Sequence, residues 1–449
     1  MRPTIARCRS LVRGQEAFVR SGLWSLVLRV SGLLSGFAIG VVLARILGPK
    51  QFGIYGLVTT GAAIATTITQ LGTPQLAVRE LSVRAERNDW AGVRGVIYQF
   101  GTATLIASLI FGALAIVTVR LLGAPASQQS LVMQGAILVL LTSFTGLFAA
   151  ELRGLAALLK GQSMDITFRP AVTFIILGGL LVTGFRISAL LALVIQNFVT
   201  FAAVAISAYW LMRIIPPHGW SVSRTRSIPW AHAALPLGAV DVLRQLDGSY
   251  GVILVGWLST GIDLGVFRVA VACMVLANMP VSIFHNLLAP KLSQLHAADQ
   301  RDEMQRLLSW TAAAMTSILI PTAIAVWFLG KAVLIFVFGA AYGDAWRPLF
   351  LFTLGQLVFG AFGMGPILLA MCEGERDLIR IYSVAVAMAF LAALPMTIAW
   401  GGTGAAAAAV ISNGLIGIMS WRYGRRELGV EISAVSLMKH LFRANEINS

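Results

Sequence analysis

Charged residues are scarce in this chain of 449 residues. Only 12% are Asp, Glu, Lys or Arg, whereas soluble domains carry roughly 25%. Hydrophobic residues make up 57% of the chain and the mean hydropathy is +0.82. These values exclude a soluble enzyme, a nucleic-acid-binding protein and a disordered protein, although the net charge is +15. We therefore expect an integral membrane protein whose basic residues gather at the cytoplasmic face.

Residues for covalent or metal chemistry are also few. Three cysteines (Cys8, Cys273 and Cys372) are too scattered for a disulfide framework or a metal site. The sequence has no Walker A loop and no GxSxG motif, and its five histidines form no HxxxH pair. The longest predicted outer loop, 330–348, is short for a membrane glycosyltransferase or ligase. We expect no catalytic residues, no metal and no cofactor, and thus a protein that is not an enzyme.

Twelve apolar runs are long enough to span a bilayer, which takes about 20 residues each. With the N-terminus inside, the inner segments hold 25 of the 34 Lys and Arg residues and the outer segments hold 6. This asymmetry predicts that both termini are cytoplasmic. The runs lie near 22–44, 53–71, 96–118, 131–150, 170–185, 187–212, 233–258, 264–289, 307–329, 349–371, 381–399 and 403–421.

The two halves of the chain are similar to each other at a shift of 212 residues, which places Gly53 on Gly265 and Tyr55 on Phe267. Both halves start inside and hold six spans, so they are parallel repeats, a transporter arrangement with the substrate site between the repeats. The sequence predicts an all-α membrane protein of two six-helix lobes. Its units are a basic N-terminus (1–21), an N-lobe (22–212), a cytoplasmic linker (213–232), a C-lobe (233–421) and a basic tail (422–449).

Charges inside predicted spans cost at least ~2.5–3.5 kcal/mol each and need a reason. Asp241, Arg244 and Asp247 follow one another at i,i+3 spacing, so they share a helix face and can pair. They form either a structural ion cluster or a cavity site for a charged substrate or protons. Arg29 either snorkels beside a glycine packing face or faces a cavity, and the same alternative holds for Arg268 near the outer end of its span.

The embedded charges favour an anionic substrate such as a phosphate or an acidic sugar. Three arginines lie in predicted spans against two aspartates, and the first lobe has no acid in any span because Glu151 and Asp165 fall in predicted loops. An exporter of organic cations would be expected to line its cavity with carboxylates. The candidate substrate-binding cations are therefore Arg29, Arg244 and Arg268.

Several segments carry a family resemblance. VVLARILGPKQFGIYGLV (41–58) and QLGTPQLAVRELS (70–82) resemble the N-terminal signature of bacterial polysaccharide-repeat flippases. These are the Wzx-like members of the multidrug/oligosaccharidyl-lipid/polysaccharide exporter superfamily. The second half is similar to the late-chain pattern of the family at VFGAAYGDAW (337–346), CEGER (372–376) and GGTGAAAAAVISNG (401–414).

The resemblance implies two lobes around a central cavity that opens alternately to each side. It implies transfer of undecaprenyl-pyrophosphate-linked oligosaccharide repeat units to the outer leaflet of the bacterial plasma (inner) membrane, for lipopolysaccharide or exopolysaccharide biosynthesis. Family members line the cavity with cations, which Arg29 and Arg244 match by location. The resemblance also allows ion coupling, for which Asp241 and Asp247 are the candidates.

Two other functions stay open. One is a drug/ion antiporter of the same superfamily, and the less favoured one is a membrane glycosyltransferase or ligase. The expected partners are the lipid-linked oligosaccharide and membrane lipids, with a polysaccharide polymerase and chain-length machinery as further candidates. No nucleic-acid partner is expected.

Overall fold

The computed structural model describes residues 2–184, 187–216, 230–362, 364–372, 374–427 and 429–431. Throughout these residues the secondary structure is helical, with no strand. Because lipid offers no hydrogen bonds, a chain this apolar satisfies its backbone groups within helices. Arg186, most of the predicted linker (217–229) and most of the predicted basic tail (432–449) lie outside the described residues.

The helices follow one another along the whole described chain with short connections. They are α1 (Arg2–Gln70), α2 (Thr73–Glu86), α3 (Trp90–Leu121), α4 (Ala126–Gly154), α5 (Leu158–Gln162), the π-helical η1 (Ser163–Phe168), α6 (Arg169–Val182), α7 (Ala189–Ile214), α8 (Trp230–Leu258), α9 (Gly261–Ala277), α10 (Met279–Ala297), α11 (Arg301–Phe338), the 3₁₀ helix η2 (Ala340–Ala345), α12 (Trp346–Ala361), α13 (Gly365–Met371) and α14 (Glu375–Glu427).

Two of these helices reverse direction and so supply two spans each. α1 breaks at Gly48 (φ 68°, ψ 171°) and α14 at Gly401 (φ 56°, ψ −135°). Both positions have the positive φ that glycine adopts at little cost. By length and composition, seven described helices can cross a membrane, or eight if the bent pair Ala340–Ala361 and Gly365–Met371 is one span.

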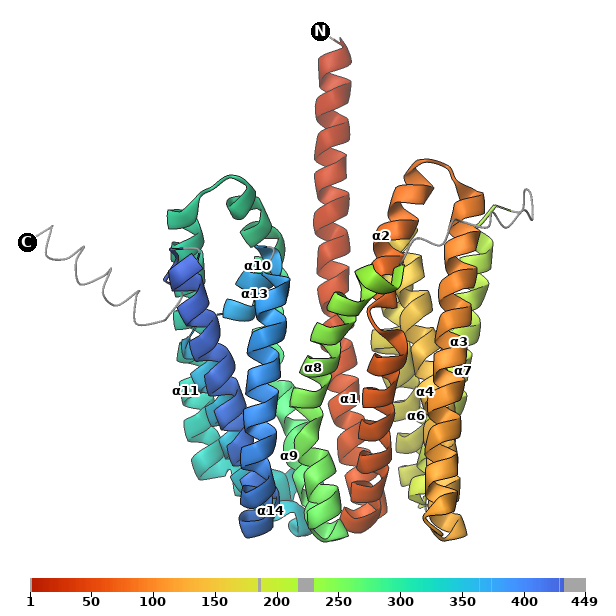
Figure 1. Cartoon of the computed structure of the whole chain (residues 1–449), viewed down its shortest axis with the longest axis vertical. Helices are drawn as coiled ribbons and strands as arrows, with labels where there is room; N and C mark the ends of the chain where they lie inside the picture. The colour runs from red at the N-terminus through yellow and green to blue at the C-terminus, as the bar shows by residue number, and fades with distance from the viewer. Residues whose placement is uncertain are drawn as a thin grey trace, which may run out of the picture.

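The twelve-helix, two-lobe fold predicted from the sequence is confirmed. α8 falls outside the apolar set because its middle carries Asp241, Arg244 and Asp247, and α9 has only 17 residues. These two helices and the doubled α1 and α14 complete the twelve spans. Figure 1 shows α2, α3, α4, α6 and α7 on one side and α10, α11, α13 and α14 on the other, with α1, α8 and α9 between them. The protein is a multi-pass membrane protein.

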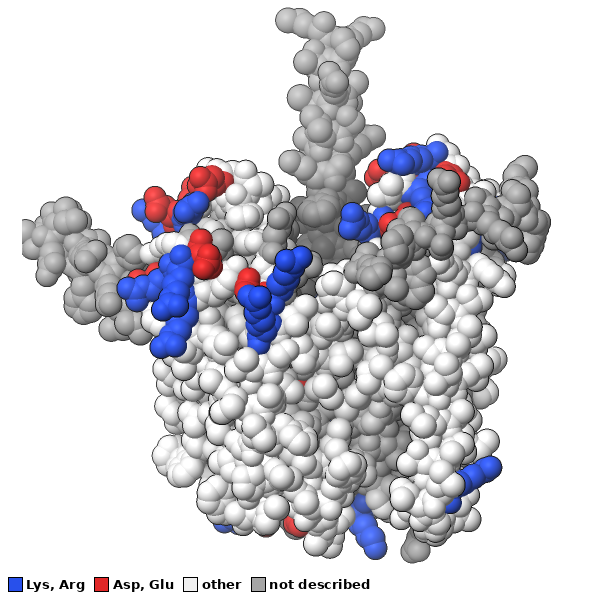
Figure 2. All heavy atoms as spheres, viewed as in Figure 1, with Lys and Arg blue, Asp and Glu red and all other residues white. Residues whose placement is uncertain are grey.

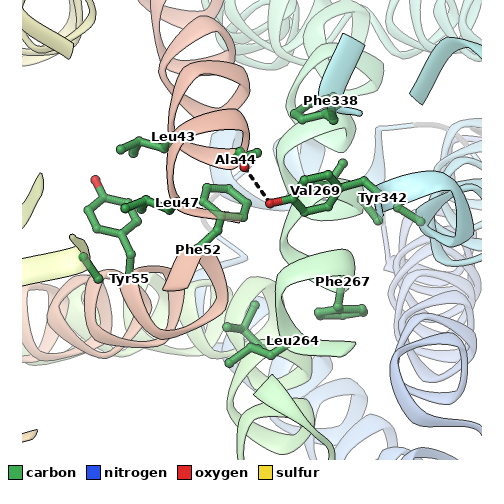
Figure 3. Close-up of a cluster of buried hydrophobic side chains, with 14 of the residues drawn as sticks. Leu43, Ala44, Leu47, Phe52, Tyr55, Leu264, Phe267, Val269, Phe338 and Tyr342 are labelled. Carbon is green, nitrogen blue, oxygen red and sulfur yellow. Dashed lines mark hydrogen bonds between the residues drawn. The ribbon is translucent and has the colours of Figure 1, made fainter. Parts of the chain in front are cut away.

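The largest group of buried apolar residues joins the two lobes at the end away from the N-terminus. There Phe52 of α1 packs edge-on against Tyr342 of η2, with ring centroids 6.4 Å apart, and Leu264 and Phe267 of α9 belong to the same cluster. Figure 3 shows these side chains converging from both lobes. Apolar burial of this kind is the main favourable term that holds the lobes together here.

Polar bonds close the same end. The Arg45 guanidinium of α1 donates to the carbonyl oxygens of Val337 (2.8 Å) and Phe336 (2.7 Å) in the last turn of α11. In the opposite direction, the Tyr342 hydroxyl donates to the Ala44 carbonyl oxygen at 2.8 Å, the dashed line in Figure 3. A cation at a helix C-terminus is favoured because the last carbonyls lack helical partners.

Paired glycines let α1 and α9 approach closely beside this cluster. A Cβ on Gly265 would lie 1.9 Å from the Pro49 carbonyl oxygen, and one on Gly53 would lie 2.7 Å from that of Gly261. Main-chain atoms on both sides leave no flexible group to move aside. The glycines that mark the internal repeat, Gly53 and Gly265, therefore meet at one interface between the lobes.

We expect Gly265→Ala to lower the thermal stability of the protein. The added methyl must push α1 away from α9, and overpacking of this kind costs about 1–3 kcal/mol. Gly36→Ala is the matched control, because a Cβ at Gly36 meets nothing within 4 Å. Thermal unfolding of both variants in one detergent measures the difference, and equal melting temperatures would contradict the close contact.

Basic side chains are unevenly distributed along the long axis. Figure 2 shows Lys and Arg gathered at the end where α1 begins and α14 ends, an apolar belt in the middle and few charges at the far end. α1 and α8 both run from the basic end toward the far end (Figure 1), as parallel repeats require. Exposed Phe198, Trp257 and Phe336 belong to the apolar outer surface, which suits contact with lipid.

The structure corrects the prediction that the first lobe has no acid in its spans. Glu151 lies within α4 and is 0% exposed. Asp165 lies in η1, which joins α5 and α6 into one apolar helical segment, Leu158–Val182. The predicted span near 170–185 starts too late because Lys160, Asp165 and Arg169 interrupt the apolar run in the sequence but not the helix.

Candidate functional site

A cavity of about 620 Å³ lies between the two lobes. Its walls come from α1, η1 and α6 on the N-lobe side and from α9 and α10 on the C-lobe side. Three arginines line it: Arg29 of α1, Arg169 at the start of α6 and Arg268 of α9. We call this the interlobe cavity. Both halves of the chain supply cations to it.

The glycine face of α1 both packs and opens into the interlobe cavity. A Cβ on Gly32 would lie 2.2 Å from the Ile166 carbonyl oxygen of η1, and one on Gly40 would lie 3.5 Å from the Ala272 Cβ of α9. Between them Gly36 lines the cavity and has open space where its Cβ would be. The face that holds η1 and α9 close therefore also presents Arg29 to the cavity.

The π-helical turn η1 sets the position of the second wall. The Thr167 hydroxyl donates to the Leu28 carbonyl oxygen of α1 at 3.0 Å, next to the Gly32–Ile166 contact. Short π-helical segments inside α-helices are frequent at functional sites. Here the turn carries Asp165 into the interlobe cavity directly before Arg169 begins α6.

Arg268 reaches across from α9 to the second half of α1. Its Nη1 donates to the Thr60 hydroxyl at 3.1 Å, and its side chain lies so close over Gly56 that a Cβ there would be 2.4 Å from its Nε. The Nε is buried and has no hydrogen-bond partner among the described residues. The Tyr55 hydroxyl, also at the cavity, donates to the Gln196 side chain of α7. Arg268 thus points at the opposite lobe.

A second, smaller cavity of about 210 Å³ lies within the C-lobe and contains Arg244 and Asp247. The Arg244 side chain is hydrogen-bonded to Tyr382, and Asp247 accepts a hydrogen bond from the Ser412 hydroxyl. We call this the C-lobe cavity. Val271 of α9 lines both cavities, so the two cavities adjoin at that residue.

The spacing of Asp241, Arg244 and Asp247 allows them to pair, and the Arg244 charge does act on Asp241, but from beyond ion-pair distance. No ion pair joins Arg244 to either carboxylate in this part of the described chain. Asp241 instead accepts a hydrogen bond of 2.6 Å from the Gln75 side chain of α2, in the other lobe. Each of the three side chains has a partner on a helix other than α8: Gln75 on α2, and Tyr382 and Ser412 on α14. The spacing of residues along α8 cannot predict these partners.

The structure brings Arg29 and Arg268 together in the interlobe cavity and leaves Arg244 and Asp247 in the C-lobe cavity, with Asp241 in the lining of neither. Sequence reasoning missed Arg169 and Asp165 because they lie in a predicted loop. The available signal was their i,i+4 spacing directly before an apolar run. No group of His, Cys, Asp or Glu that could hold a metal ion occurs among the described residues.

Comparisons with known proteins agree with this architecture. The model of a family described as polysaccharide biosynthesis protein matches residues 18–296, more than half of the chain. The stage V sporulation protein B of Bacillus subtilis (strain 168) is 30% identical over 90 residues, which are 19% of this chain and 17% of that protein.

Solved structures give the same fold over nearly the whole chain. An inward-facing multidrug resistance MATE family transporter of the MOP superfamily superposes with a TM-score of 0.70 at 16% identity, covering 90% of this chain and 98% of that one. The lipid II flippase MurJ, in an inward closed conformation, gives a TM-score of 0.69 at 13% identity, covering 90% and 87%.

Proposed function

The chain belongs to the polysaccharide biosynthesis protein family, and from this premise we propose that it moves lipid-linked oligosaccharide units across the bacterial inner membrane. The observation that carries the proposal is the interlobe cavity, into which Arg29, Arg169 and Arg268 project from both lobes. Guanidinium groups bind phosphate with two parallel hydrogen bonds, and the linkage of such a substrate is a pyrophosphate. The resemblance to polysaccharide-repeat flippases implies that the lipid carrier is undecaprenyl.

The mechanism we propose is physical and makes or breaks no covalent bond. The arginines hold the pyrophosphate between the lobes, the sugars follow through the interlobe cavity, and the lipid tail stays among the apolar outer surfaces. The cavity then opens alternately to the two sides as the lobes rock about their contact. For an outer opening, the Arg45 and Tyr342 bonds to the other lobe must break.

The direction of transport rests on the charge distribution. We propose that the basic end shown in Figure 2, where α1 begins and α14 ends, is cytoplasmic, because Lys and Arg near span ends are retained on that side. The outer end is then the one closed by the Phe52–Tyr342 cluster. The arrangement takes substrate from the inner leaflet and releases it at the outer leaflet.

The test is a deletion strain that carries either the wild-type gene or single variants. We expect the deletion to accumulate lipid-linked repeat units and the wild type to clear them. Arg29→Ala is expected to insert normally and leave the units accumulated, since it removes a cation from the interlobe cavity. If the deletion strain instead becomes sensitive to drugs without accumulating repeat units, the protein is a drug antiporter. If the purified protein forms glycosidic bonds, it is an enzyme.

The C-lobe cavity enters the proposal as a second polar site. Arg244 is exposed to it and bonded to Tyr382, so it can contact an acidic sugar, and Asp247 is our ion-coupling candidate with Asp241. In the same strain we expect Arg244→Ala to prevent surface polysaccharide. Normal polysaccharide from a well-expressed Arg244→Ala protein would remove Arg244 from the substrate path. Contacts with a polymerase and chain-length machinery are likewise proposals.

A further inference from the structure

One carboxylate lines the interlobe cavity among the three arginines. Asp165 is half-buried there. Among the described residues it has neither a hydrogen-bond nor an ion-pair partner, in contrast to Asp241 and Asp247. A site for an anion gains nothing from a fixed negative charge, since like charges repel. Any role assigned to Asp165 must therefore account for this repulsion.

The charge environment of Asp165 links it to the arginines. Arg153, near the end of α4, interacts electrostatically with both Asp165 and Arg29. The cations that line the interlobe cavity with Asp165 are Arg29 on α1, Arg169 on α6 and Arg268 on α9, and Arg153 acts on Asp165 from outside that lining. Clustered guanidinium groups repel one another when the cavity is empty, and a carboxylate among them reduces that repulsion.

The position of Asp165 is fixed by the packing of η1. The Thr167 hydroxyl is bonded to the Leu28 carbonyl oxygen, and Ile166 lies against Gly32, where a Cβ would meet its carbonyl oxygen at 2.2 Å. Both contacts are to main-chain atoms of the helix that carries Arg29. These contacts hold the backbone next to Asp165 against the helix that carries Arg29.

We propose that Asp165 is a built-in counter-ion that competes with the substrate phosphates for the arginines and keeps binding weak enough for release. The inference rests on the proposed function and deepens it by assigning a specificity-determining residue. A site that translocates a charged ligand needs binding that is favourable enough for entry and weak enough for exit. Asp165 sets that balance by lowering the positive potential that the diphosphate meets.

Two alternative roles for Asp165 predict different results. If Asp165 only stabilises the fold through its electrostatic interaction with Arg153, its loss lowers stability and leaves anion affinity unchanged. If Asp165 instead accepts hydrogen bonds from the ligand, its loss weakens binding. Of these three roles for Asp165, the competing counter-ion is the one that predicts a variant with tighter anion binding.

The experiment measures binding of farnesyl diphosphate, a prenyl diphosphate without sugar, to the purified full-length protein at fixed low salt. Farnesol, which has the same chain without the phosphates, is the reference probe. We expect the wild type to prefer farnesyl diphosphate to farnesol and Asp165→Asn to bind the diphosphate about tenfold more tightly, with farnesol unchanged. Asp165→Glu, which keeps the charge, is expected to stay within about twofold of the wild type.

Glu86→Gln is the matched control, because it removes one negative charge from an exposed position at the end of α2, outside the interlobe cavity. Its affinity for farnesyl diphosphate is expected to equal that of the wild type. If Asp165→Asn does not fold, Asp165→Ala removes the same charge. In the deletion strain the charge-neutral variant should also export more slowly, because release becomes limiting.

If Asp165→Asn and Asp165→Ala bind farnesyl diphosphate as the wild type does, or more weakly, the proposed counter-ion role of Asp165 is wrong. A gain of the same size in Glu86→Gln overturns it too, since the effect then comes from net charge. If the wild type binds farnesyl diphosphate no better than farnesol, the anion site of the proposed function fails, and the counter-ion fails with it. The two failures are thus distinguishable by the wild-type measurement.

Discussion

An Arg268→Ala variant is expected to reach the membrane in normal amount and to lose at least about 99% of export. Arg268 is the cation that the C-lobe places against α1 in the interlobe cavity, where it bonds Thr60 and lies over Gly56. A hydrogen bond to a charged group contributes about 1.5–3 kcal/mol, and two such bonds to a phosphate amount to a hundredfold or more in affinity. The measurement is the steady-state level of lipid-linked repeat units in the deletion strain.

Arg347→Ala is the matched control for this variant. Arg347 also belongs to the C-lobe, but it is exposed near the start of α12, beside the Trp346 ring, and lines neither cavity. We expect it to export normally. Arg268→Lys keeps the charge but not the planar fork, so partial export is expected. Normal export by Arg268→Ala would remove the cationic cavity from the transport path.

The second large effect is expected from Gly36→Trp, which should block export while the fold stays intact. Gly36 lines the interlobe cavity, and a Cβ there meets no heavy atom within 4 Å. A tryptophan side chain can therefore grow into the space that the substrate headgroup needs without displacing a helix. We expect near-complete loss of export, with a melting temperature within a few degrees of the wild type.

Gly61→Trp separates blockage from a general effect of tryptophan. Gly61 lies on the same helix, is exposed, has open space around its Cβ and does not line the interlobe cavity. The Gly61 variant is expected to export normally. Export by Gly36→Trp at the rate of Gly61→Trp would show that the substrate does not pass through this cavity.

The candidate site was only partly predictable from the sequence. Arg29 and Arg268 stand out because a charge within an apolar run is rare, whatever the tertiary structure. Arg169 and Asp165 were missed because they lie where the apolar pattern pauses, although the backbone continues through η1 as a helix. A hydropathy pattern reflects whether side chains are apolar and not whether the backbone is helical. A span predicted from it therefore stops where polar side chains line a cavity, even though the helix continues.

Spacing along one helix was a poor guide to pairing. Asp241, Arg244 and Asp247 share a face of α8, but each meets a side chain from elsewhere: Gln75, Tyr382 and Ser412. Neighbours at i,i+3 interact weakly compared with hydrogen bonds from helices packed against that face. The spacing along α8 allows the three charges to form an ion cluster. Tertiary packing instead gives each of them a hydrogen-bond partner on another helix.

The sequence by itself determined the membrane class, the two-lobe fold and the number of spans. A bilayer has one thickness and offers no hydrogen bonds, so apolar length translates directly into helices that cross it. It also indicated an excess of embedded cations over embedded acids. That excess remains, because the helices that take in Glu151 and Asp165 also take in Arg153, Lys160 and Arg169.

Only the tertiary structure decided which charges share a cavity. It placed Arg29, Arg169, Arg268 and Asp165 between the lobes and Arg244 with Asp247 inside the C-lobe. It also joined Gly53 to Gly261 and Gly265 to Pro49, which closes the end away from the start of α1. These contacts link residues some 200 positions apart in the chain, and their partners are set by helix packing, which hydropathy and spacing along one helix do not encode.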